Sequence, residues 1–178
     1  AQNNAKGIMD GRQMAVSFSL LRENSLYWNY YIEGYLKGKS PVAFDLLYWN
    51  SDNTNVPGKV HSRLLRDLYL ENQLIKGELT IGKTRIDLGK IKSPIMLVSG
   101  KEDHIALWQG TYKGRALFGG PTRFVLAESG HIAGIINPPT AKKYGYWTND
   151  ACSEQEPESW LQTAQHTEGS WWGDWQNW

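Results

Sequence analysis

Hydrophobic residues in the first part of the chain recur near helical spacing. One set runs from Ile8 to about Leu21, and the next is mainly aromatic, at Tyr27, Trp28, Tyr31, Ile32, Tyr35 and Leu36. The second set predicts a helix with an aromatic stripe. Pro57 is typical of the first turn of another helix, whose expected buried face is formed by Val60, Leu64, Leu65 and Leu68. Residues 1–76 are therefore predicted to be mainly helical.

After Gly77 the pattern changes to short strands. Two short apolar runs around Gly82 and Lys83 fit a hairpin. The run Ile95–Val98 is typical of a strand buried on both faces, and a helix-like segment at 108–117 separates it from a second such run at 123–126. This strand, helix, strand order predicts parallel neighbours. A further helix is expected at 157–165, so residues 77–178 are predicted to be α/β.

Candidate chemistry follows the two apolar strands. The first strand leads into SGKEDHI, which contains Asp103 and His104, and the second leads into AESGHIAG, which contains His131. Because the carboxyl ends of parallel strands meet at one edge of a sheet, we expect Asp103 and His131 to lie close together. Gly130 and Gly134 suit a tight backbone around that histidine. An alternative is that Asp103 only caps the following helix and His131 is a surface residue.

An acid followed by a histidine is the order of the last two members of an α/β-hydrolase triad. In such a triad the carboxylate fixes the tautomer of the imidazole and stabilises the imidazolium. The nucleophile motif, Gly-x-Ser-x-Gly or Gly-x-Cys-x-Gly, does not occur in the sequence. The one cysteine, Cys152, follows the histidine and lies among acidic residues that disfavour a thiolate, so we interpret it as structural. This chain alone is expected to be inactive.

Composition narrows the function classes. Nineteen basic and eighteen acidic residues leave a formal charge of +1, which gives no reason to expect nucleic acid binding. No apolar run is long enough to predict a membrane span, and the polar amino end lacks the pattern of a secretory signal. Nine Trp and nine Tyr indicate either an aromatic core or an apolar ligand path or interface, with Trp28, Tyr31, Trp49 and Trp171 as candidates.

Five strings, in order along the chain, resemble the C-terminal half of class I poly(3-hydroxyalkanoate) synthases. They are VAFDLLYWNSDNTNVPG at 42–58, KEDHIALW at 101–108, RFVLAESGHIAGIINPP at 123–139, YWTNDA at 146–151 and GSWWGDW at 169–175. No string is unique to that family, but the five together are very specific. The resemblance runs over nearly the whole chain.

The resemblance implies the C-terminal portion of an α/β-hydrolase fold with a mainly helical cap region. Residues 1–76 would be the cap subdomain and its return to the core, and residues 77–178 the C-terminal part of the core. The family polymerises (R)-3-hydroxyacyl-CoA with a Cys, Asp and His triad and releases coenzyme A. Asp103 and His131 match the Asp and His of this triad. His104 would lie next to them without contacting the substrate itself. Leu107 stands where the family usually has proline.

The resemblance implies no cofactor, because coenzyme A is part of the substrate. It also implies no metal site. It implies a cytoplasmic homodimer, located at the surface of polymer granules, that binds hydroxyacyl-CoA and the polyester product. Whether Asp103 orients His131 or helps to activate the incoming hydroxyl stays open at this stage. Two other interpretations remain. The chain could be part of a serine-dependent lipase or esterase, or a non-catalytic protein that binds granules or a synthase.

Overall fold

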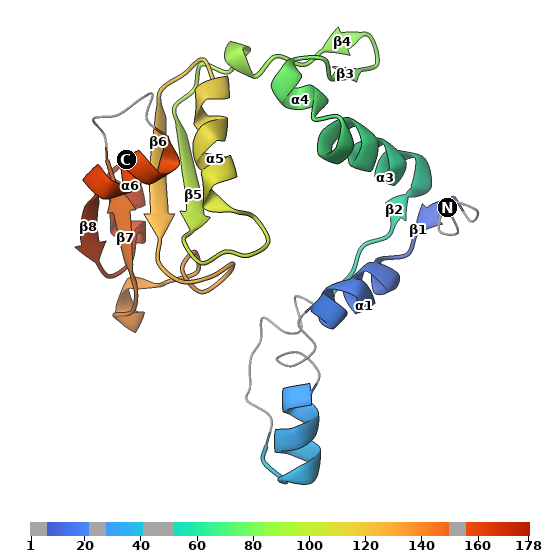
Figure 1. Ribbon diagram of the computed structural model, residues 1–178, viewed down its shortest axis with the longest axis vertical. Helices are drawn as coiled ribbons and strands as arrows, with labels where there is room; N and C mark the ends of the chain where they lie inside the picture. Colours follow the sequence, from blue (N-terminus) through green and yellow to red (C-terminus); the bar gives the residue numbers. More distant parts are fainter. Residues whose placement is uncertain (1–6, 22–27, 41–51, 150–155) are drawn as a thin grey trace. The chain divides into compact units, whose positions relative to one another are not determined.

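The computed structural model describes residues 7–21, 28–40, 52–149 and 156–178 (Figure 1). The chain divides into two compact units, Ala1–Lys76 and Gly77–Trp178. The boundary coincides with the change of sequence pattern near residue 77. That the first unit is a cap stays a prediction.

The first unit is mainly helical where it is described. Its two short strands pair antiparallel, with Ile8 opposite Pro57 and Met9 opposite Val56. The elements are β1 (Ile8–Met9), α1 (Gly11–Leu21), the π-helix η3 (Tyr31–Leu36), β2 (Val56–Pro57), α3 (Gly58–Leu64), the π-helix η4 (Leu65–Leu70) and α4 (Gln73–Lys76). Helix α3 begins near the predicted place, but Pro57 is its N-cap residue and the last residue of β2 rather than part of its first turn.

The expected buried face of the α3 and η4 helices is wrong in detail. Val60, Leu64 and Leu65 are exposed and Leu68 is half-buried. The buried residue of η4 is instead Asp67, whose carboxylate accepts a hydrogen bond from Arg63 Nε at 2.7 Å. Periodicity predicted an apolar side, but β1, β2 and α4, the described elements that pack most closely on these helices, leave that side uncovered.

The aromatic stripe predicted near residue 30 is also exposed. The rings of Trp28 and Tyr31 meet edge to face at 6.2 Å, and those of Tyr31 and Tyr35 stack at 5.3 Å. Tyr35 is 78% exposed. These rings contact one another along one helix, so the stripe is not part of a core within the described chain. Trp49, another aromatic candidate, lies outside the described residues.

The second unit is built on a four-stranded sheet with the order β5-β6-β7-β8. The strands are β5 (Ile95–Gly100), β6 (Thr122–Ala127), β7 (Gly145–Thr148) and β8 (Gln165–Glu168). Strands β5 and β6 are parallel, as predicted, and the other two pairs are antiparallel. The predicted hairpin is present as β3 (Thr80–Ile81) and β4 (Thr84–Arg85), with Gly82 at a φ of 62° in its turn.

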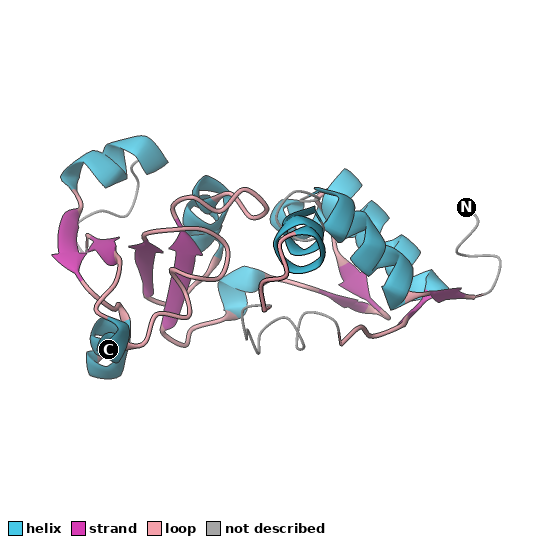
Figure 2. Ribbon diagram, turned by 90° about the horizontal axis from the view of Figure 1, so that it is seen from below, coloured by secondary structure: helices cyan, strands magenta, loops and turns pink. Residues whose placement is uncertain are grey.

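The helices of this unit lie on both sides of the sheet. They are α5 (Trp108–Gly114), α6 (Pro157–Thr163) and α7 (Trp172–Asn177), with short 3-10 turns η5 (Leu88–Lys90), η6 (Arg115–Leu117) and η7 (Pro139–Ala141). Figure 2 shows α7, at the C-terminus, across the sheet from the other two. No helix in the described ranges is both long and apolar enough to cross a membrane.

Strand β6 is the buried strand of the sheet, whereas β5 lies at its edge. Phe124 through Ala127 are buried, but Ile95 through Val98 are only half-buried. The prediction that the first strand is buried on both faces is therefore wrong for this chain. The physical reason is that, among the described strands, β5 has β6 on one side and no neighbour on the other.

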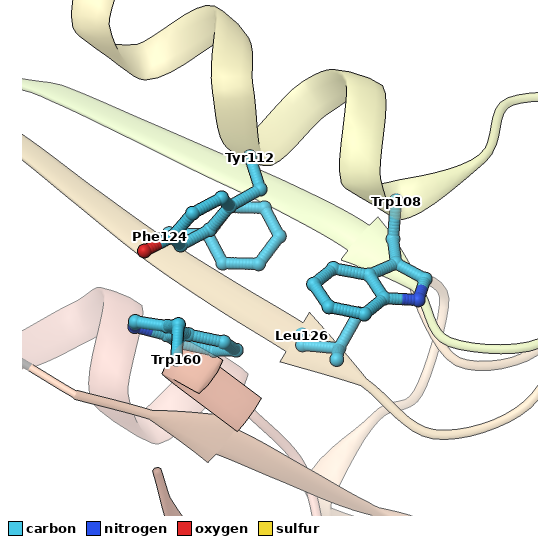
Figure 3. Close-up of a cluster of buried hydrophobic side chains, with 5 residues drawn as sticks. All are labelled: Trp108, Tyr112, Phe124, Leu126 and Trp160. Atoms are coloured by element: carbon cyan, nitrogen blue, oxygen red, sulfur yellow. The ribbon is translucent and has the colours of Figure 1, made fainter. Parts of the chain in front are cut away.

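The core is a cluster of aromatic rings on one face of β6 (Figure 3). Trp108 and Tyr112 come from α5, Phe124 and Leu126 from β6, and Trp160 from α6. Trp160 is 0% exposed, and its ring lies 5.1 Å from that of Phe124 and 5.3 Å from that of Tyr112. Edge-to-face and tilted ring contacts of this kind stabilise a core beyond simple burial.

Candidate active site

The two loops that carry the candidate residues leave the same edge of the sheet. Gly100 and Ala127, the last residues of β5 and β6, are directly paired. Beyond them the loops stay joined by backbone hydrogen bonds, from Lys101 N–H to Ala127 O at 2.8 Å and from Glu102 N–H to Ser129 O at 3.0 Å. The parallel pairing and these two bonds hold both loops together just before Asp103 and His131.

Asp103 and His131 are in direct contact. Nδ1 of His131 lies 2.7 Å from Oδ2 of Asp103. The other carboxylate oxygen, Oδ1, accepts hydrogen bonds from the backbone N–H groups of Ile105 at 2.8 Å and Ala106 at 3.0 Å. The Asp103 side chain is 8% exposed and that of His131 is 47% exposed. The alternative that Asp103 only caps the following helix is wrong, because α5 begins at Trp108 with Leu107 as its N-cap residue and has no side-chain cap. The bonds to Ile105 and Ala106 instead fix the loop before that helix.

The surroundings of Asp103 favour its ionised form. Burial opposes ionisation, but the hydrogen bonds from His131, Ala106 and Ile105 outweigh it, so the pKa of Asp103 lies below its ordinary value of 3.8. An ionised carboxylate accepts hydrogen bonds only, so Nδ1 of His131 carries the proton in this contact. That tautomer leaves Nε2 as the ring nitrogen that can accept a proton.

This low pKa makes the Asp103 loop resistant to acid. A carboxyl group with a lower pKa in the folded state stabilises the fold above its unfolded pKa, and this is lost as pH falls through the folded pKa. We expect the amides of Ile105 and Ala106 to keep constant protection against hydrogen exchange down to about pH 4, the unfolded value, and to lose it at lower pH. Exchange measured by NMR on the intact protein tests this, and loss of protection near pH 5 would contradict it.

Close packing of the His131 loop depends on glycine at two positions. A Cβ atom at Gly134 would lie 1.8 Å from Glu128 O, and one at Gly100 would lie 2.8 Å from Gly130 O. The predicted need for glycine at Gly130 is wrong, because a Cβ atom there would be in ordinary contact, 3.7 Å from Glu102 O. The unusual backbone lies one residue earlier, at Ser129, where φ is 72°.

The remaining candidates have less defined places. His104 is exposed beside Asp103, and its supporting role stays a prediction. Leu107 has a φ of −56°, within the range that a proline ring imposes, so the backbone at this position is compatible with proline. Cys152 lies outside the described residues. Within the described ranges no group of three or more His, Cys, Asp or Glu residues could hold a metal ion.

Sequence reasoning missed a set of contacts at the end of the chain. The indole N–H groups of Trp171 and Trp172 both donate to Ile135 O, in the loop of His131, at 3.1 Å each. Asp174 accepts two hydrogen bonds from Arg123 on β6. The three tryptophans in GSWWGDW indicated that this segment makes contacts, but they did not indicate which residue the indole N–H groups bind.

Comparison with known proteins identifies close relatives. Poly(3-hydroxyalkanoate) polymerase subunit PhaC of Rhizobium meliloti is 48% identical over 178 residues, which is 100% of this chain and 29% of the relative. The protein of the same name from Cupriavidus necator is 47% identical over 172 residues, 96% of this chain and 29% of its own length. Poly(3-hydroxyalkanoate) polymerase of Methylorubrum extorquens is 45% identical over 173 residues, 97% and 28% respectively.

The chain thus spans less than a third of the length of these relatives. The family described as alpha/beta hydrolase fold matches residues 2–138, a range that includes both Asp103 and His131. The parallel β5 and β6 strands, and the acid and histidine that follow them, agree with that match. The chain therefore belongs to the alpha/beta hydrolase fold family.

Proposed function

We propose that this chain is the Asp- and His-bearing part of a polymerase that joins 3-hydroxyacyl units from coenzyme A thioesters into poly(3-hydroxyalkanoate). The observation that carries the proposal is the 2.7 Å contact between His131 and Asp103. The whole length of the chain that contains this contact matches part of a protein named poly(3-hydroxyalkanoate) polymerase subunit PhaC. The resemblance further suggests a cytoplasmic homodimer at the surface of polymer granules, which we include in the proposal.

The proposed chemistry is covalent acyl transfer. A cysteine thiol from the part of the polymerase outside this chain gives its proton to Nε2 of His131, and its sulfur attacks the thioester carbonyl carbon. The bond from that carbon to the coenzyme A sulfur breaks, and His131 returns the proton to this sulfur. The hydroxyl of the next hydroxyacyl unit then gives its proton to His131, and its oxygen forms the new ester bond. The cysteine sulfur is released and takes the proton back.

The position of Asp103 supports one of the two roles left open by the sequence. Both carboxylate oxygens are already engaged, one with His131 and one with the N–H groups of Ile105 and Ala106. The side chain is nearly buried. We therefore assign Asp103 to the orientation of His131 and the stabilisation of its imidazolium, rather than to direct contact with the incoming hydroxyl.

An assay with (R)-3-hydroxybutyryl-CoA tests the proposal. It uses the intact protein, meaning this chain together with the part that supplies the cysteine. We expect release of coenzyme A thiol together with insoluble polyester, in equal molar amounts of thiol and incorporated hydroxyacyl unit. Release of thiol with free 3-hydroxybutyrate instead of polymer would overturn the proposal in favour of a hydrolase. Binding to polymer granules without any thiol release would overturn it in favour of a non-catalytic protein.

A further inference from the structure

The loop of His131 is fixed at its far end by two tryptophan side chains. Within the loop, the N–H groups of Ile135 and Ile136 donate to Ile132 O at 3.0 and 2.9 Å, which makes a compact turn directly after the histidine. The carbonyl of Ile135 accepts both indole N–H groups, from Trp171 and Trp172, at 3.1 Å each. A carbonyl oxygen has two lone pairs, so these two donors use its full capacity.

The same tail is held to the strand that leads into the loop. Arg123 on β6 pairs with Asp174 on α7 through Nε to Oδ2 at 3.0 Å and Nη2 to Oδ1 at 2.8 Å. Both side chains are mostly buried, with exposed fractions of 22% and 19%. Two parallel charge-assisted bonds between planar groups define orientation as well as distance. Since Arg123 precedes His131 on one continuous strand and loop, the tail connects the start of β6 to the turn beyond it.

The imidazole of His131 is about half exposed. Its side-chain partner within the described residues is Asp103, so its position depends on that bond and on the path of its loop. The loop enters at Ser129 with an unfavourable φ of 72°. A loop that contains such a residue persists where surrounding contacts hold it in place. The indole bonds to Ile135 O are contacts of that kind.

We propose that Trp171, Trp172 and Asp174 form a clamp that positions His131 for catalysis. The clamp acts through Ile135 O and Arg123, so its members are positioning residues. The effect on catalysis rests on the proposed function, whereas the effect on the His131–Asp103 contact does not. Loss of the indole donors is expected to let the turn shift, which lengthens the Nδ1 to Oδ2 contact and slows proton transfer at Nε2.

The sharpest test removes the two N–H donors and keeps the rings. In the intact protein, Trp171 and Trp172 are both replaced by benzothienylalanine, in which sulfur stands in place of the indole N–H. We expect kcat for coenzyme A release to fall about tenfold with KM nearly unchanged. The low-field proton resonance of His131 Nδ1–H should weaken or move upfield. The matched control is the same replacement at Trp175, an exposed ring on the same helix that packs against Trp171 at 6.0 Å.

A second pair of variants separates positioning from folding. Asp174→Asn removes one charge from the pair with Arg123. It should lower kcat and change the His131 Nδ1–H resonance in the same way as the double tryptophan replacement. Asp174→Glu keeps the charge, so its kcat and resonance should lie between those of Asp174→Asn and the wild type. The clamp is overturned if the double tryptophan replacement leaves kcat and the resonance as they are in the wild type. A protein that releases no coenzyme A would overturn the proposed function, yet a changed resonance in the double variant would still support the clamp.

Discussion

Asp103→Asn is expected to lower kcat for coenzyme A release by about 10³- to 10⁴-fold in the intact protein that we propose to be a polymerase. The amide oxygen of asparagine can still accept the N–H bonds of Ile105 and Ala106, so the loop should keep its path. The amide nitrogen would face Nδ1 of His131 and donate to it. The imidazole proton would then sit on Nε2, which could no longer accept a proton from a thiol or a hydroxyl.

Asp87→Asn is the matched control for this substitution. Asp87 also accepts a backbone hydrogen bond two residues ahead, from Gly89 N–H at 2.9 Å, but it lies in a separate turn. Its replacement should leave kcat within about twofold, as is usual for surface substitutions. Rates are measured as thiol release, and far-UV circular dichroism checks the fold. Near-normal polymer synthesis by the Asp103→Asn protein would refute the assignment of Asp103.

Gly134→Ala is expected to have the second largest effect, a loss of about 100-fold or more in kcat/KM. The new Cβ atom would lie 1.8 Å from Glu128 O, a backbone atom that cannot rotate away. The loop from Glu128 to Gly134 contains His131, so relief of the clash must move the histidine relative to Asp103. Overpacking of this kind also destabilises by about 1–3 kcal/mol.

Gly130→Ala provides a control in the same loop. A Cβ atom there meets Glu102 O at 3.7 Å, an ordinary contact, so this variant should retain most of its activity although it is next to His131. Steady-state kinetics of the two variants, with thermal unfolding as a check on stability, distinguish a local steric effect from a general sensitivity of the loop. Equal losses in both variants would contradict the steric explanation.

The contact between Asp103 and His131 could be predicted from the sequence because the two strands before them are strongly marked. Ile95–Val98 and residues 123–126 are short apolar runs separated by one helix, so their parallel pairing and the meeting of Asp103 with His131 follow from topology. Strands β7 and β8 were not predicted. The sequence of β8, QHTE, has no apolar run, and its extended form depends on pairing with β7, which periodicity does not register.

Burial of the helical faces was less predictable for a different reason. The apolar positions of η4 and of the aromatic stripe follow helical spacing, as at Leu65 and Tyr31, but spacing does not tell which segment covers them. The indole contacts of the clamp were missed because these bonds join side-chain nitrogens to a carbonyl in the loop 36 and 37 residues earlier. Such long-range bonds to backbone atoms leave no local pattern.

The loop of Asp103 has a buried anchor at each end, since it leaves the sheet at Gly100 and enters α5 at Trp108, a member of the aromatic core. The loop of His131 likewise ends near Asn137, which is buried and donates to Lys143 O at 2.7 Å. Reactive groups held on such short spans need little reorganisation when charge develops on them. The positions of Asp103 and His131 thus depend on side chains several residues away, on ring packing at Trp108 for one loop and on the buried amide of Asn137 for the other.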